Sequence, residues 1–199
     1  MVQPKAPSNP GRRKFLINAT SVVGAGAVAG AVVPFIGSWN PSAKAEAAGS
    51  PARADLSMLL SGEMMLVEWR GVPVYVVKHT QESMSVLDKN LSRLSDPDSL
   101  EDQQPDYARN ELRSRKKGIS VLTAVCTHLS CAPKFYPELG ATDFDSDWQG
   151  GFFCPCHGSK FDLVGRVYAG VPAPTNLPIP PHYFETEDIL IIGEDGGAV

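Results

Sequence analysis

The chain has 199 residues, of which 43% are hydrophobic and 20% are charged, and its formal net charge is −4. This length is sufficient for one globular domain with an additional segment, and the composition excludes both a disordered chain and a strongly basic nucleic-acid-binding protein. The charge is unevenly distributed, because residues 1–14 hold four of the 18 basic residues and no acidic residue, which leaves −8 for the remaining chain.

The uncharged segment FLINATSVVGAGAVAGAVVPFIGSW, residues 15–39, directly follows these basic residues. About 23 helical residues extend over roughly 35 Å, which is enough to cross a hydrocarbon core of about 30 Å. Because the basic residues 1–14 precede the segment, we expect them to lie in the cytoplasm. The pattern therefore predicts a single membrane-spanning anchor, with the rest of the chain on the opposite side of the membrane.

The basic segment also contains GRRKFL at residues 11–16, which resembles a twin-arginine export signal. That export route carries folded proteins, which suits a protein that receives a cofactor in the cytoplasm. An ordinary basic flank is the alternative interpretation. The stretch Ala43-Lys44-Ala45 resembles a signal-peptidase site, but the apolar segment is longer than the core of about 7–15 residues in a cleaved signal, so we expect a retained anchor.

Residues 40–54 are small and polar, with proline and glycine, and predict a flexible hinge linker. A soluble domain then covers residues 55–199, where short β-rich segments alternate with turn signals. Residues 86–118 are polar, and we expect a short helix near Ser92 followed by an exposed loop with solvated charges. The pattern predicts an all-β domain. Expected strands lie at 66–69, 72–78, 119–125, 151–153, 160–163, 166–168, 183–186 and 189–192.

All four cysteines and two of the four histidines occur in two short motifs, CTHLSC at residues 126–131 and CPCHGS at residues 154–159. Each motif follows an expected strand and enters a loop, a common location for functional residues. The spacing excludes a haem-attachment C-x-x-C-H motif and a thioredoxin-like C-x-x-C pair. A structural zinc site and an iron–sulfur cluster with mixed ligands both remain open. The other histidines, His79 and His182, are expected to be ordinary surface or core residues.

The two motifs resemble the two boxes of Rieske iron–sulfur proteins, in which a cysteine and a histidine from each box bind one [2Fe–2S] cluster. In that family the cysteines hold one iron and the histidines hold the other. The resemblance further implies a disulfide bond between Cys131 and Cys156, which join the two loops. The implied cluster ligands are Cys126, His128, Cys154 and His157.

The sequence GVPAPTNL, residues 170–177, resembles the proline-rich loop that covers the cluster in iron–sulfur subunits of bacterial ubiquinol–cytochrome c reductases. This resemblance implies an all-β Rieske domain of antiparallel sheets, with a small cluster-binding subdomain near residues 124–178. It also implies that His157 contacts ubiquinol and accepts its proton, with Leu129 shaping the docking surface. The remaining implied cofactor-binding residues are Ser159, Pro172 and Pro174.

The same resemblance implies the partners of the chain. They are cytochrome b, a c-type cytochrome that accepts the electron, ubiquinol and the lipid bilayer, in a complex that is dimeric. The expected location is the bacterial inner membrane, with the Rieske domain in the periplasm. The alternative is the small Rieske subunit of a periplasmic oxidase such as arsenite oxidase, which cleavage after Ala45 would favour. A soluble Rieske ferredoxin and a zinc-binding module are more distant alternatives.

Phe161 follows Ser159 by two residues, at a position where this family often has a tyrosine. A tyrosine hydroxyl can donate a hydrogen bond to a cluster sulfur, whereas phenylalanine cannot. We therefore expect a lower midpoint potential than in relatives that contain the tyrosine.

Overall fold

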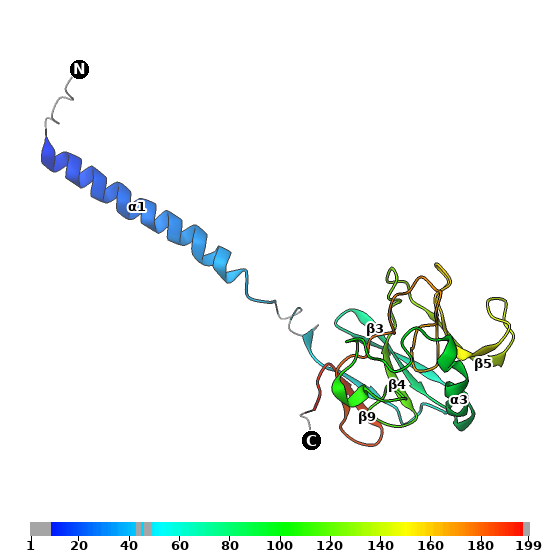
Figure 1. Cartoon of the computed structure of the whole chain (residues 1–199). Helices are drawn as coiled ribbons and strands as arrows, with labels where there is room; N and C mark the ends of the chain where they lie inside the picture. The colour runs from blue at the N-terminus through cyan, green and yellow to red at the C-terminus, as the bar shows by residue number, and fades with distance from the viewer. Residues whose placement is uncertain (1–8, 43–44, 46–48, 197–199) are drawn as a thin grey trace, which may run out of the picture. The chain divides into compact units, whose positions relative to one another are not determined.

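The structure is a computed structural model that describes residues 9–42, 45 and 49–196. The chain divides into one unit spanning Met1–Ala47 and a second unit spanning Ala48–Val199. The first unit contains a long helix and the second is rich in β-strands (Figure 1). Residues 1–8, and Ala43 and Lys44 of the predicted cleavage motif, lie outside the described residues.

Helix α1 spans Pro10–Gly37. The side chain of Asn9 caps its N-terminus by accepting a hydrogen bond from the backbone N–H of Arg12 at 3.1 Å, and Pro10 suits the first helical position. Among the described residues, α1 is the helix that is long and apolar enough to cross a membrane. The helix begins five residues before the uncharged segment 15–39, so it also includes the basic residues 12–14.

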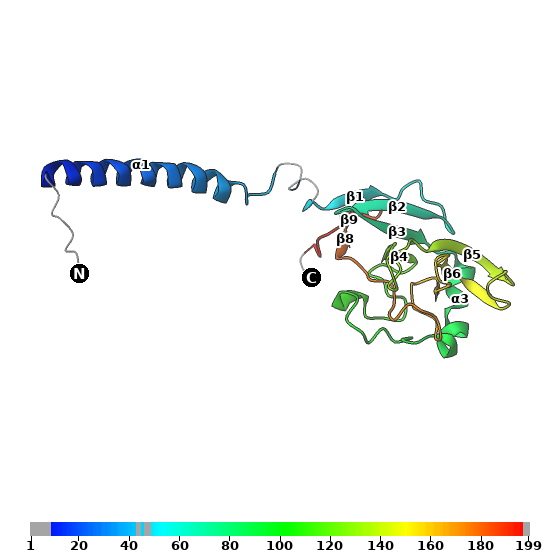
Figure 2. The same ribbon diagram turned by 90° about the horizontal axis from the view of Figure 1, so that it is seen from above.

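Within residues 49–196, the strands form three antiparallel sheets, shown in Figure 2. This arrangement confirms the predicted all-β domain of antiparallel sheets. The first sheet has the order β1 (Ala52–Asp55), β9 (Ile189–Ile192) and β8 (His182–Phe184). The second has the order β2 (Met64–Trp69), β3 (Val72–Lys78) and β4 (Ile119–Thr123). The third has the order β5 (Lys134–Gly140), β6 (Trp148–Phe153) and β7 (Lys160–Phe161).

Strands β3 and β4 separate two hydrophobic cores, because successive residues of a strand point to opposite faces. Val74 and Val121 pack with residues of β1 and β9. Tyr75 and Leu122 face the other way and pack with residues of β6 and β7. The second core also contains two of the motif cysteines. Burial on both faces explains why β3 is apolar from Val72 to Val77.

The predicted hairpin at residues 66–78 is confirmed as β2 and β3. Its two connecting residues, Arg70 and Gly71, have φ angles of 55° and 73°. Positive φ at both positions is the requirement of a type I′ turn, whose twist matches that of the flanking strands. The Arg-Gly pair therefore sets the register of this hairpin.

Three elements differ from the sequence prediction. Strand β1 begins at Ala52, inside the region assigned to the linker, and pairs with β9, so the folded domain starts earlier than residue 55. Strand β5 was not predicted. Residues 166–168 form no regular strand and contact β7 through a single bridge between Phe161 and Val167.

The segment 86–118 contains the 3-10 helices η1 (Leu87–Arg93) and η2 (Asp106–Ala108), and it follows the short helix α3 (Gln81–Ser85). Helix η1 confirms the short helix expected near Ser92. The prediction that the rest is an exposed loop with solvated charges is wrong, because its interior side is packed against the domain. The buried residues there include Leu94, Gln104, Ala108, Arg113 and Ser114.

Candidate metal centre

The two cysteine motifs form loops of the same backbone design. In the first loop, the N–H of Cys126 donates to the carbonyl of Cys131, and the N–H of Ser130 donates to the carbonyl of Cys126. In the second loop, the N–H of Cys154 donates to the carbonyl of Ser159, and the N–H of Gly158 donates to the carbonyl of Cys154. Ser130 and Gly158 occupy the same loop position, with φ angles of 63° and 76°. Each loop thus turns tightly around its first cysteine.

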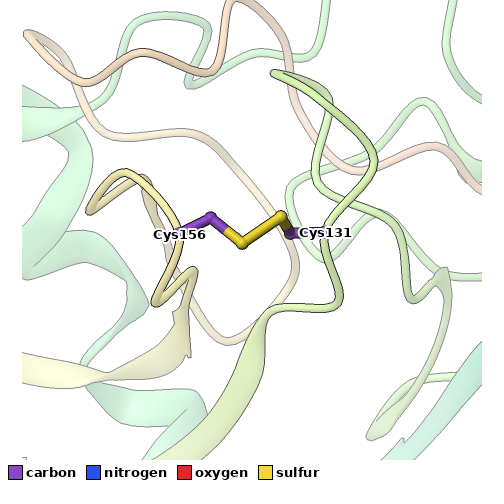
Figure 3. The surroundings of a disulfide bond; sticks show 2 residues. All are labelled: Cys131 and Cys156. Carbon is purple, nitrogen blue, oxygen red and sulfur yellow. A yellow bond between two sulfur atoms is a disulfide. The ribbon is translucent and has the colours of Figure 1, made fainter.

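A disulfide bond joins Cys131 of the first loop to Cys156 of the second. Figure 3 shows the bond lying between the two loops. This pairing is the one that the family resemblance implied. Because the bond links residues 25 positions apart, it holds both loops together at one end of the domain.

Cys126 and Cys154 retain free thiols, and each is 1% exposed. The sulfur of Cys154 lies within 4.8 Å of both disulfide sulfurs. Burial raises the pKa of the Cys126 thiol, while the backbone N–H of His128 lowers it, the nearby Cys154 thiol raises it, and the hydroxyl of Ser159 lowers it. The two free thiols are therefore both buried, and His128 and Ser159 offset part of the effect of burial on the Cys126 thiol.

The two motif histidines lie beside each other. The ring centroids of His128 and His157 are 4.7 Å apart, and the ring planes are almost perpendicular, at 87°. His128 is partly buried, whereas His157 is exposed. The four residues predicted as ligands thus present thiols at the buried end of the site and imidazoles toward its surface.

The proline-rich loop is held against both motif loops. The backbone N–H of Ala173 donates to the hydroxyl of Ser159 at 3.0 Å, and the hydroxyl of Thr127 donates to the carbonyl of Thr175 at 2.7 Å. Ser159 is fully buried, and its hydroxyl also lowers the pKa of the Cys126 thiol. Thr127 was missed by the sequence analysis, although its position between Cys126 and a histidine was a usable signal.

The remaining predicted site residues lie at the surface. Leu129 follows His128 and is 66% exposed. Pro172 and Pro174 are also exposed and flank the buried Ala173. Leu129 is thus an exposed apolar side chain directly after His128 in the chain.

His79 and His182 lie away from the motif loops and are buried. The Nε2 atom of His79 is 2.8 Å from the hydroxyl of Ser120, and the Nδ1 atom of His182 is 2.9 Å from the carbonyl of Pro180. Burial lowers the pKa of each to about 4. They are neutral core residues, consistent with the expectation from the sequence.

The donor set fits a cluster with mixed ligands, since two buried thiols and two adjacent imidazoles come from two loops tied by a disulfide. Residues 101–181 match the family described as "Rieske [2Fe-2S] domain". Residues 3–42 match the family described as "Ubiquitinol-cytochrome C reductase Fe-S subunit TAT signal". The fold and the site therefore define a Rieske protein.

Similar proteins specify the family further. The chain is 51% identical over 190 residues to the ubiquinol-cytochrome c reductase iron-sulfur subunit of Allochromatium vinosum, covering 96% of this chain and 92% of that one. Identity to the subunit of Rhodospirillum rubrum is 43%, over 94% and 96% of the two chains. Identity to that of Blastochloris viridis is 42%, over 92% of each. The chain belongs to the family of ubiquinol-cytochrome c reductase iron-sulfur subunits.

Proposed function

We propose that this chain is the Rieske subunit of a bacterial ubiquinol–cytochrome c oxidoreductase, the cytochrome bc1 complex, and that it carries one [2Fe–2S] cluster. The observation that carries the proposal is the pair of matching loops, joined by the Cys131–Cys156 disulfide, that bring two buried thiols and two neighbouring imidazoles to one end of the domain. Membership of the iron-sulfur subunit family supports it.

We assign the ligands by residue type and burial. Cys126 and Cys154 hold one iron in the buried half of the site, and His128 and His157 hold the other nearer the surface. When bound, the cluster takes up one electron and gives it up again. Because two neutral imidazoles replace two thiolates, the ligand set carries less negative charge, which raises the reduction potential.

His157 is the proposed contact for ubiquinol. An imidazole that binds iron through one ring nitrogen keeps its other nitrogen for a hydrogen bond. The exposure of the His157 ring supports this role, because a quinol hydroxyl can approach that nitrogen from solvent, and the exposed Leu129 supports an apolar contact with the quinone ring. The buried thiols remain shielded from water behind them.

We further propose the assembly and topology of the chain. Cytochrome b and a c-type cytochrome are its partners in a dimeric complex, with the electron passing to the cytochrome. Helix α1 is the retained single-pass anchor, and its preceding basic residues favour a cytoplasmic N-terminus with the Rieske domain in the periplasm. The three relatives described above are ubiquinol-cytochrome c reductase subunits and lend no support to an arsenite-oxidase subunit.

The ligand assignment is tested by the metal content and visible spectrum of the purified chain. The wild-type chain is expected to contain about two irons. Separate Cys126→Ser and His128→Gln variants are expected to lose the iron and the colour. His182→Gln removes a buried histidine outside the site and is the control expected to keep both. A colourless wild-type chain that binds one zinc would overturn the proposal.

A further inference from the structure

Arg113 is a fully buried residue of the segment 86–118. Its Nη1 donates to the carbonyl of Val164 at 3.0 Å, and its Nη2 donates to the carbonyl of Leu177 at 2.8 Å. Nη2 also contacts the side-chain oxygen of Gln104 at 3.1 Å. Burial lowers the pKa of Arg113 to about 10, so the guanidinium remains charged at neutral pH. The residue is thus a charged fork directed at neutral carbonyl groups.

The two backbone carbonyls belong to two segments that lie apart in the chain. Val164 lies in the turn that follows the second cysteine motif, and Leu177 is the last residue of the proline-rich loop 170–177. The same two segments are joined by a second bond, from the N–H of Leu177 to the carbonyl of Gly165 at 2.8 Å. The buried Asn176 adds a third bond there, because its Oδ1 accepts from the N–H of Val167 at 2.8 Å. Arg113 therefore adds two side-chain hydrogen bonds to a junction that these contacts also hold.

The backbone around Arg113 is adapted to this contact. Gly165 has a φ angle of 78°, and a Cβ atom there would lie 3.2 Å from Nη1 of Arg113 and 3.1 Å from the side chain of Leu122. Arg113 itself has a φ angle of 46°, in the left-handed region that is uncommon for residues other than glycine. Such a conformation persists where surrounding contacts hold it in place.

The proline-rich loop is attached to the site at one end and to Arg113 at the other. Ala173 and Thr175 bond to the two motif loops through Ser159 and Thr127. Two residues later, Leu177 bonds to Arg113. Arg113 shares this rear attachment with Asn176, which bonds Val167 and Ser99.

We propose that Arg113 is a positioning residue, whose guanidinium fixes the proline-rich loop over the cluster site by tying Leu177 to Val164. This inference rests on the proposed function for its effect on the cluster, but the loop attachment itself does not depend on the cluster. An Arg113→Lys variant keeps the positive charge and loses the planar fork that reaches both carbonyls.

The test measures amide hydrogen exchange in the purified full-length chain without its cluster. Arg113→Lys is expected to raise the exchange rate of residues 170–177 roughly tenfold or more, through loss of a charge-assisted hydrogen bond. Leu190→Ala is the matched control, because Leu190 is fully buried in the other core, on β9. At conditions of equal global stability, it is expected to leave exchange in 170–177 unchanged. Equal exchange in both variants would overturn the proposal.

A second variant covers the case in which Arg113→Lys does not fold. Gly165→Ala retains the arginine and pushes a methyl group toward its Nη1, so it is expected to loosen the same residues. Unchanged exchange of residues 170–177 in the Gly165→Ala variant would also count against the proposal. In the loaded chain, the variants are expected to shift the midpoint potential while Leu190→Ala does not. A wild-type chain without a cluster would defeat the proposed function, whereas the exchange result would still decide the role of Arg113.

Discussion

Phe161 is fully buried in the same core as Cys126 and Cys154. It lies on β7, the strand that directly follows the second cysteine motif and pairs with β6. The ring contributes packing to this core but no hydrogen bond. The proposed cluster therefore depends on backbone N–H groups and on Ser159 for donors to sulfur.

A Phe161→Tyr variant is expected to raise the midpoint potential of the cluster. A hydroxyl that donates to sulfur stabilises the reduced, more negative state, and about 1 kcal/mol of added stabilisation corresponds to about 40 mV for one electron. Redox titration of the purified chain measures the change. Phe152→Tyr is the control, since Phe152 is equally buried in this core but lies on β6 before the motif. An unchanged or lower potential in Phe161→Tyr would refute the explanation.

The buried His79 makes a pH-dependent contribution to stability. Its pKa is lowered by burial to about 4 in the folded protein, against about 6.5 when unfolded. Between these values the unfolded chain binds more protons, so stability is present above pH 6.5 and is lost as the pH falls toward 4. The contribution amounts to as much as about 3 kcal/mol.

Replacing His79 with glutamine is expected to flatten the pH dependence of unfolding in this range. Glutamine retains a polar group for Ser120 and cannot be protonated. Urea unfolding of wild type and variant at a series of pH values from 7 to 4 gives the comparison. The free energies of unfolding should converge as the pH falls, and parallel curves would show that His79 does not titrate as described.

At the scale of elements, Asp145 connects three parts of the domain. It lies between β5 and β6, and its carboxylate bonds Arg93 at the end of η1 at 2.6 Å and Lys160 at the start of β7 at 2.7 Å. Its side chain is only 5% exposed. Although burial opposes ionisation, hydrogen bonds from Lys160 and Arg93 hold the pKa of Asp145 at about 2. The carboxylate thus links the segment 86–118 to the strand that follows the second motif.

An Asp145→Asn variant is expected to destabilise the domain by about 2 kcal/mol, because it removes the one buried carboxylate that both partly buried cations share. Asp147→Asn is the control. Asp147 is 76% exposed and 3.6 Å from Arg93, so its loss is expected to cost less than about 0.5 kcal/mol. Chemical denaturation compares the two variants. Equal, small losses would mean that the Asp145 contacts contribute little.

The strands with strong local signals were predictable, and those shaped by distant contacts were not. The β2–β3 hairpin follows from two apolar segments around Arg70-Gly71. Strand β5 was missed because Pro137 and Glu138 interrupt its apolar alternation. The expectation that the charges of residues 86–118 are solvated is wrong for Arg113. This residue donates to the carbonyls of Val164 and Leu177, which lie more than 50 residues away along the chain.

The candidate site shows the same division. The resemblance of the two motifs to the Rieske boxes implied the disulfide pairing, which is confirmed. The ligand set that it also implied stays a prediction. The bonds from Thr127 to Thr175 and from Ala173 to Ser159 depend on how three separate loops meet. No pattern within one loop specifies them, so they required the folded structure.

At the scale of the whole molecule, the linker is expected to let the soluble domain move between two partners. Replacing residues 45–50 with prolines stiffens the connection into an extended segment. Turnover of the assembled complex is expected to fall several-fold, while the affinity for ubiquinol stays the same. A Gly/Ser replacement of equal length is the control that keeps turnover normal. Normal turnover in the proline variant would show that tethered motion is not required.

The central claim is that this chain places a Rieske cluster in a membrane-bound quinol-oxidising complex. The most direct test is electron paramagnetic resonance of ascorbate-reduced membranes from cells that produce the chain. We predict a Rieske-type signal that remains with the membranes and changes when a quinone-site inhibitor is added. Absence of the signal, or its recovery in the soluble periplasmic fraction, would contradict the account.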